Sequence, residues 1–195
     1  MRIGRYRGYG KHAGAGWLSV ALLAGAFACC SGPAAAQMTT HELTHNGYSR
    51  PYLTYRPTHL PPHPAVVFML GGIGSTAVTE SREFGWTEEA DKYGFLVVFP
   101  DLVATHTDRP ANRKTNITFW EMAGSRTHVL APGMKPVDDD GYLTEVLHEV
   151  LRKEKPDPHR VFFAGFSSGS GMVQLFASRH AKEIAAIAAA ATPLM

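Results

Sequence analysis

The sequence is short of cysteine: its 195 residues contain two, Cys29 and Cys30, and none follows them. A disulfide framework or a cluster of cysteine ligands for a metal is therefore excluded from residue 31 onward. Acidic residues are absent from the first 36 positions, which hold four of the 19 basic residues. The rest of the chain carries 15 basic and all 17 acidic side chains, a net charge of −2. This balance removes the main electrostatic argument for binding nucleic acid.

Long apolar runs are missing as well. The N-terminal run Trp17–Ala28 has 12 residues, whereas a transmembrane helix needs about 20. It follows a basic leader, Met1–Gly16, and precedes the small residues Ala34–Ala36, a three-part pattern typical of a secretory signal peptide. We therefore expect residues 1–36 to be a cleaved signal and 37–195 to be a secreted or periplasmic domain without stable membrane insertion.

Short apolar segments alternate with helical patterns along this domain. Continuous apolar runs predict buried strands, and spacing at i, i+3, i+4 and i+7 predicts helices. Alternation around Asn46-Gly47 predicts a hairpin. The expected elements are a hairpin over 39–56, strands 65–70, 95–99, 161–164 and 184–190, and helices 80–93 and 169–179, with one more from Asp138–Asp140 to Pro156.

Strands that alternate with helices imply an α/β protein with a parallel sheet covered on both faces. Residues 102–137 show no clear periodicity. Connections of this length in compact domains are usually lids, binding loops or disordered segments. We interpret the three aspartates at 138–140 as caps of the helix that follows, because carboxylates favour a helix N-terminus.

The segment from Gly165 to Gly169 has the form G-x-S-x-G, with Ser167 at its centre. In a nucleophile elbow, a serine on a tight turn between a strand and a helix exposes its hydroxyl above the sheet. This segment follows an apolar strand and opens a helix, as that mechanism requires. We therefore predict Ser167 as the nucleophile, with the N–H groups of Ser168 and Gly72 as the oxyanion hole.

The order of these features resembles the α/β-hydrolase family of secreted polyhydroxybutyrate depolymerases and feruloyl esterases. The pattern G-W-x-x-x-A-D-x-x-G-F-x-V-V-F-P at 85–100 and R-V-F-x-x-G-F-S-S-G at 160–169 carry the resemblance. It implies a three-layer α/β-hydrolase fold with a mostly parallel sheet. It also implies a serine esterase that hydrolyses polyhydroxyalkanoate, feruloyl or other acyl esters and needs no metal or cofactor.

The sequence departs from the family where the catalytic acid and histidine are expected. These follow the serine in chain order, but residues 180–195 hold one histidine, His180, and no aspartate. His180 lies about 15 Å along the helix from Ser167, and His106 and His128 are weaker candidates for the base. We expect a C-terminally truncated domain that lacks the last strands, so an inactive fragment is the alternative. Leu70 also stands where the family has a histidine before its glycine.

Two further interpretations concern other chemistry. Residues 72–77 read G-x-G-x-x-A after a strand, and Asp101 closes the next strand, a pattern that allows a dinucleotide-binding βαβ unit as a minor alternative. His41 and His45, like His59 and His63, repeat at a spacing of four. That spacing joins two metal ligands on a helix and not on a strand or a proline-rich connector. We expect these histidines to lie on the solvated surface.

Overall fold

The computed structural model describes residues 35–112, 114–122 and 129–192, all within the unit Pro33–Met195. The predicted signal peptide lies almost wholly outside these residues, so its cleavage stays a prediction. None of the helices described there is long and apolar enough to span a membrane.

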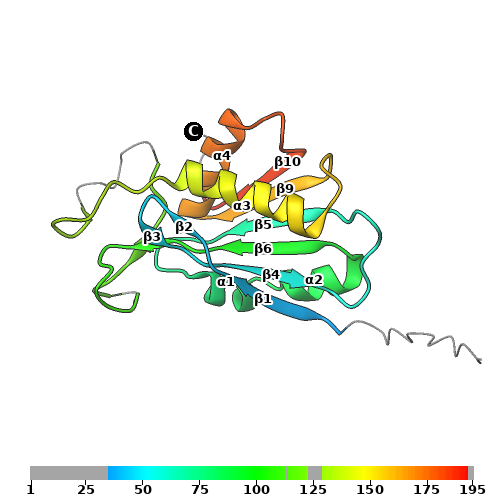
Figure 1. Cartoon of the computed structure of the whole chain (residues 1–195), viewed down its shortest axis with the longest axis horizontal. Helices are drawn as coiled ribbons and strands as arrows, with labels where there is room; N and C mark the ends of the chain where they lie inside the picture. Colours follow the sequence, from blue (N-terminus) through cyan, green and yellow to red (C-terminus); the bar gives the residue numbers. More distant parts are fainter. Residues whose placement is uncertain (1–34, 113, 123–128, 193–195) are drawn as a thin grey trace, which may run out of the picture. The chain divides into compact units, whose positions relative to one another are not determined.

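A six-stranded sheet forms the centre of the described part, in the order β1-β4-β6-β5-β9-β10 (Figure 1). The four strands β6, β5, β9 and β10 pair in parallel, whereas β4 pairs antiparallel with both β1 and β6. This arrangement confirms the predicted, mostly parallel sheet. The strands are β1 (Gln37–His41), β4 (Tyr52–Arg56), β5 (Val66–Leu70), β6 (Leu96–Pro100), β9 (Val161–Phe166) and β10 (Ala186–Ala190).

Two small ribbons lie outside this sheet. The first is a hairpin whose turn residues Asn46 and Gly47 have φ of 50° and 84°, as a two-residue turn requires. The second ribbon shows that the segment 102–137 is not a plain loop. The ribbons consist of β2 (Thr44–His45) with β3 (Tyr48–Ser49), and of β7 (Val103–Ala104) with β8 (Thr118–Phe119).

Helices cover both faces of the sheet because side chains alternate along the buried strands. Val66, Phe68 and Leu70 of β5 pack with α3 and α4, whereas Met69 packs with α1 and α2 on the opposite face. Helix α3 buries Tyr142, Leu143, Val146, Leu147 and Val150, and its position agrees with the prediction. The helices are α1 (Ala77–Glu83), α2 (Trp86–Tyr93), α3 (Asp139–Glu154) and α4 (Ser168–Arg179).

The single helix predicted over 80–93 is wrong, because two helices occupy this stretch. Helix α1 already begins after Thr76, whose side chain accepts from the Thr79 N–H while Thr79 accepts from the Thr76 N–H. It ends at Glu83, with Phe84 as its C-cap, and Gly85 then takes a left-handed conformation, with φ of 68°, before α2. A glycine takes this left-handed conformation at little cost. The helix is therefore interrupted at Gly85, although the apolar spacing in the sequence continues on both sides of it.

A buried ion pair joins Asp139, the first residue of α3, to Arg50, which lies between β3 and β4. Asp139 Oδ1 lies 2.5 Å from Arg50 Nη2, and both side chains are almost fully buried. The Arg50 guanidinium lies 3.6 Å from the centre of the Tyr142 ring and donates to the Asp101 carbonyl at 2.9 Å. Burial raises the pKa of Asp139, and the charge of Arg50 opposes that rise. Asp138 caps α3 as predicted, by accepting from the Gly141 N–H, and Asp139 and Asp140 lie in its first turn. The cap predicted for the Asp139 side chain is wrong, because this carboxylate pairs with Arg50.

Candidate active site

Ser167 lies on the turn between β9 and α4, in the strand, turn and helix context that the sequence predicts. Its φ of 55° and ψ of −122° are rare for a residue with a side chain, and such a conformation costs about 1–3 kcal/mol. Hydrogen bonds hold it. The Ser167 N–H donates to the Ala190 carbonyl at 2.9 Å, and the Ser167 carbonyl accepts from the Ser170 N–H and the Thr192 hydroxyl.

The two glycines of the motif are required by close packing. A Cβ on Gly165 would lie 2.5 Å from the Gly169 carbonyl oxygen. A Cβ on Gly169 would lie 2.1 Å from the carbonyl oxygen of Leu70 and 2.4 Å from that of Gly71. The first turn of α4 therefore rests against the end of β5, and the turn at Ser167 is as tight as an elbow requires.

The loop after β5 brings Gly72 beside the serine. A Cβ added to Gly72 would lie 3.2 Å from Ser167 Cβ, so these two residues lie next to each other and a larger residue at position 72 would be crowded. Ser168 is the first residue of α4, where backbone N–H groups have no partner within the helix and favour an anion. The structure thus brings together Ser167, Ser168 and Gly72, and their catalytic roles stay predictions.

Trp120 supports this loop from a segment in which the sequence pattern predicted no structure. Its fully buried indole Nε1 donates to the Gly71 carbonyl at 2.9 Å. The Glu80 side chain packs against the same glycine, since a Cβ added to Gly71 would lie 1.8 Å from Glu80 Oε1. Thr118 makes two further hydrogen bonds: its hydroxyl donates to the Ser75 carbonyl, and its carbonyl accepts from the Gly74 N–H. A lone tryptophan in a stretch without periodicity gave no signal of this contact.

No histidine among residues 35–112, 114–122 and 129–192 is hydrogen-bonded to Ser167 Oγ. His180 follows the C-terminal end of α4, where its ring stacks on Phe176 and its Nδ1 lies 3.3 Å from Glu183 Oε1. His106 contacts the Thr105 hydroxyl at 3.1 Å. His128 lies outside the described residues. His180 is thus engaged away from the elbow, as its helical distance predicts.

Glu183 gives the chain a testable pH dependence. Hydrogen bonds from His148, at 2.9 Å, and from His180 outweigh desolvation and hold the pKa of Glu183 below its usual value of 4.5. A carboxylate with a lowered folded pKa stabilises the protein above its unfolded pKa, and this contribution disappears as the pH falls through the folded value. We expect Glu183→Gln to lower the free energy of unfolding at pH 6 by at most about 1 kcal/mol, because solvent screens the pair. Urea unfolding at pH 6 and at pH 3.5 would check this, and an equal deficit at both values would contradict it.

The surface placement predicted for the paired histidines holds for His59 and His63, which are exposed, and is wrong for His41 and His45. His41 is half-buried, stacks on Tyr52 and is hydrogen-bonded to the Thr54 hydroxyl at 2.8 Å. The side chain of His45 is only 13% exposed, and its two ring nitrogens each lie 3.0 Å from a carboxylate oxygen. These carboxylates belong to Asp138 and Glu145 of the α3 region.

The position of Asp101 argues against the dinucleotide alternative. Its Oδ1 accepts from the N–H groups of Ala77 and Leu102, both at 3.0 Å. Ala77 is the first residue of α1, so a carboxylate of the protein itself occupies the helix N-terminus where a pyrophosphate would bind. Burial raises the pKa of Asp101, and these two N–H groups oppose the rise.

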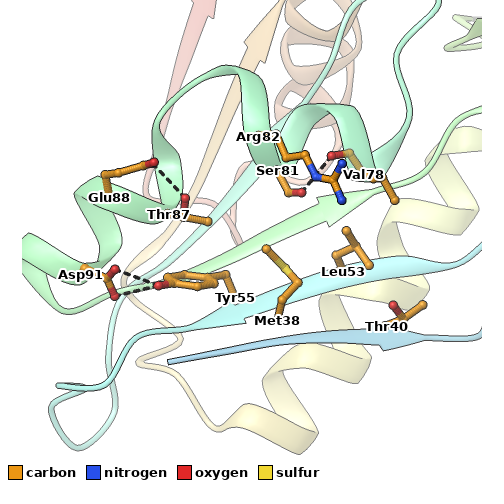
Figure 2. Close-up of a pocket in the computed structure, with 10 residues that line it drawn as sticks. All are labelled: Met38, Thr40, Leu53, Tyr55, Val78, Ser81, Arg82, Thr87, Glu88 and Asp91. Atoms are coloured by element: carbon orange, nitrogen blue, oxygen red, sulfur yellow. Dashed lines mark hydrogen bonds between the residues drawn. The ribbon is translucent and has the colours of Figure 1, made fainter. Parts of the chain in front are cut away.

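Hollows flank the sheet on the side of α1 and α2, and two of them bear on the site. One, of about 500 Å³, lies between the strands β1 and β4 and these two helices (Figure 2) and contains none of the predicted site residues. There the Tyr55 hydroxyl donates to both oxygens of Asp91, and burial together with this carboxylate raises the pKa of Tyr55 to about 12. The other, of about 290 Å³, lies beside the elbow. The exposed rings of Phe84 and Phe166, 5.4 Å apart, line it.

Comparisons with known proteins bear on the fold. No family model matches the chain. The bifunctional acetylxylan esterase/xylanase XynS20E of Neocallimastix patriciarum is 23% identical over 147 residues, which are 75% of this chain and 18% of that protein. A solved ferulic acid esterase aligns with a TM-score of 0.59 and 18% identity over 80% of this chain and 59% of its own. The poly(3-hydroxybutyrate) depolymerase LpqC from Bordetella parapertussis aligns with a TM-score of 0.54 and 19% identity over 78% of this chain and 50% of its own.

The chain thus spans between about half and three fifths of the solved structures that it matches. At less than 25% identity, these likenesses concern the fold alone. The chain therefore has the α/β-hydrolase fold, as the resemblance of its sequence to the esterases and depolymerases of that family implies.

Proposed function

We propose that the protein is a secreted serine esterase that hydrolyses carboxylic esters through Ser167. The positive φ of Ser167, in the turn from a central strand to a helix, is the observation that carries this proposal. Strain of this kind persists only where the surrounding structure holds it, and it is concentrated at functional sites. The esterases and the depolymerase that share the fold support the reaction class.

In the proposed reaction, Ser167 Oγ attacks the ester carbonyl carbon and gives up its proton to a base. The N–H groups of Ser168 and Gly72 stabilise the negative charge on the carbonyl oxygen. Collapse of this intermediate releases the alcohol and leaves an acyl-enzyme, which water then hydrolyses to the free acid. No histidine of the described residues is hydrogen-bonded to Ser167, so none of them is assigned as this base.

The substrate is an ester of a polyhydroxyalkanoate, of ferulate or of another acyl group, and the apolar hollow beside the elbow is suited to its apolar part. The proposal needs no partner other than the ester substrate. For a depolymerase, this substrate would be a polymer. The competing proposal is a catalytically incomplete chain, and the lack of a hydrogen-bonded base at Ser167 in the described residues favours it.

Turnover of p-nitrophenyl butyrate by the full chain and by a Ser167→Ala variant tests the proposal. We expect Ser167→Ala to lower kcat/KM by at least about a thousandfold, because removing the nucleophile of a serine hydrolase costs more than any supporting group. Ser178→Ala, at an exposed serine of the same helix, should leave turnover unchanged. Equal rates for the full chain and Ser167→Ala would contradict the esterase and support the incomplete chain.

A further inference from the structure

We propose that Trp120 is a positioning residue for the oxyanion hole, because its indole N–H sets the orientation of the peptide between Gly71 and Gly72. This inference rests on the proposed esterase function. Its basis is the hydrogen bond of 2.9 Å from Trp120 Nε1 to the Gly71 carbonyl oxygen. Trp120 touches neither the serine nor the oxyanion, and it acts through the backbone.

The first step of the argument is the planarity of the peptide group. In a trans peptide the C=O of one residue and the N–H of the next lie in one plane and point in opposite directions. A donor that holds the Gly71 carbonyl on one side therefore directs the Gly72 N–H to the other side. Gly72 lies next to Ser167, since a Cβ added to Gly72 would be 3.2 Å from Ser167 Cβ.

The second step is that this loop needs an external hold. Two successive glycines have access to torsions on both sides of φ = 0 at little cost, so the peptide between Gly71 and Gly72 can rotate. A rotated peptide would turn the Gly71 carbonyl oxygen toward the developing oxyanion and repel it. Leu70, the residue before this pair, has no polar atom in its side chain that could prevent the rotation.

The third step concerns how firmly Trp120 itself is held. Its side chain has no solvent exposure. Trp120 is the residue directly after β8, which pairs with β7. The guanidinium of Arg50 lies 5.9 Å from its ring centre. An indole N–H buried in this way has the Gly71 carbonyl as its acceptor and gains nothing by turning away. The donor is thus preorganised, as electrostatic stabilisation of a transition state requires.

The test is Trp120→Phe, which keeps a buried ring and removes the donor, beside Tyr52→Phe as the matched control. The buried Tyr52 ring lies on β4, and its hydroxyl donates to Glu149 Oε1 at 2.8 Å, so this variant also removes one hydrogen-bond donor from a buried ring. We expect Trp120→Phe to lower kcat for p-nitrophenyl butyrate by about 10- to 100-fold with KM within twofold. This loss is smaller than the 10²–10³-fold effect of deleting an oxyanion donor outright. Tyr52→Phe should leave both constants within about twofold of those of the original chain.

A second measurement keeps the inference testable whatever the turnover. In protein labelled with ¹⁵N-glycine, the Gly72 amide signal should move in Trp120→Phe by more than any other glycine signal, and it should stay in place in Tyr52→Phe. An unmoved Gly72 signal, or an unchanged kcat in a folded Trp120→Phe, would overturn the inference. A displaced Gly72 signal in a chain without Ser167-dependent turnover would instead contradict the proposed esterase and support the positioning role.

Discussion

Replacing Arg50 by methionine is expected to lower the free energy of unfolding by about 3–5 kcal/mol, because it leaves the Asp139 carboxylate buried without its countercharge. The two side chains are 2% and 0% exposed and only 2.5 Å apart, so water cannot replace the lost partner. Domains of this size are stable by about 5–15 kcal/mol, and the loss is a large part of that. Urea unfolding followed by circular dichroism at pH 7 measures it.

The same variant should show a pH dependence of definite sign. Burial raises the folded pKa of Asp139 above the ordinary value of 3.8, and loss of Arg50 raises it further. A group with a raised folded pKa binds its proton more tightly in the folded state, so stability increases as the pH falls through that pKa. The deficit of Arg50→Met should therefore shrink between pH 7 and pH 4.5.

Two matched variants separate this effect from a general loss of charge. Arg56→Met breaks an exposed pair with Glu154, at 3.1 Å, and should cost at most about 1 kcal/mol. In the double variant Arg50→Met with Asp139→Leu, most of the stability should return, because no charge is left buried. A deficit in the double variant as large as in Arg50→Met alone would contradict the explanation.

Gly169→Ala is expected to be the second most damaging substitution, with a cost of about 3 kcal/mol or more. The added methyl group would lie 2.1 and 2.4 Å from two carbonyl oxygens of the backbone, those of Leu70 and Gly71. Overpacking in a core usually costs about 1–3 kcal/mol, and here neither neighbour is a flexible side chain that could move away. The elbow and the loop after β5 would have to separate.

The control for this variant is Ser178→Ala, an exposed position two turns further along α4, which should change stability by less than about 0.5 kcal/mol. Thermal unfolding of both variants is the measurement. Because the added methyl group pushes against the loop that contains Gly72, Gly169→Ala should also lose Ser167-dependent turnover at temperatures where it remains folded. Wild-type stability in Gly169→Ala would show that the close approach is relaxed in solution.

The parts of the fold that depend on local patterns could be predicted from the sequence. The buried strands around Phe68 and Val97 read as continuous apolar runs, and α3 follows the spacing of Tyr142, Leu143 and Val146. The elbow is also local, since a strand, a glycine-framed serine and a helix are consecutive in the chain. These features need no knowledge of distant contacts.

The parts that depend on distant contacts could not be predicted. Asp139 looks like a helix cap until Arg50, 89 positions earlier in the chain, is found buried beside it. Trp120 is 49 positions from the carbonyl that it holds, in a segment without periodicity. The break at Gly85 was missed for a different reason, because apolar spacing continues on both sides of it and a single glycine does not reveal its torsion.

The contact of Gly169 with the Leu70 and Gly71 carbonyls has a consequence for engineering. The nucleophile turn and the oxyanion loop share one packing surface, so neither can be diversified as an independent module. Libraries that randomise residues 71–76 alone would mostly return chains in which the serine has also moved. Substitutions in that loop should be selected together with those at 165–169, and Trp120 belongs in the same set because its indole donates to the Gly71 carbonyl.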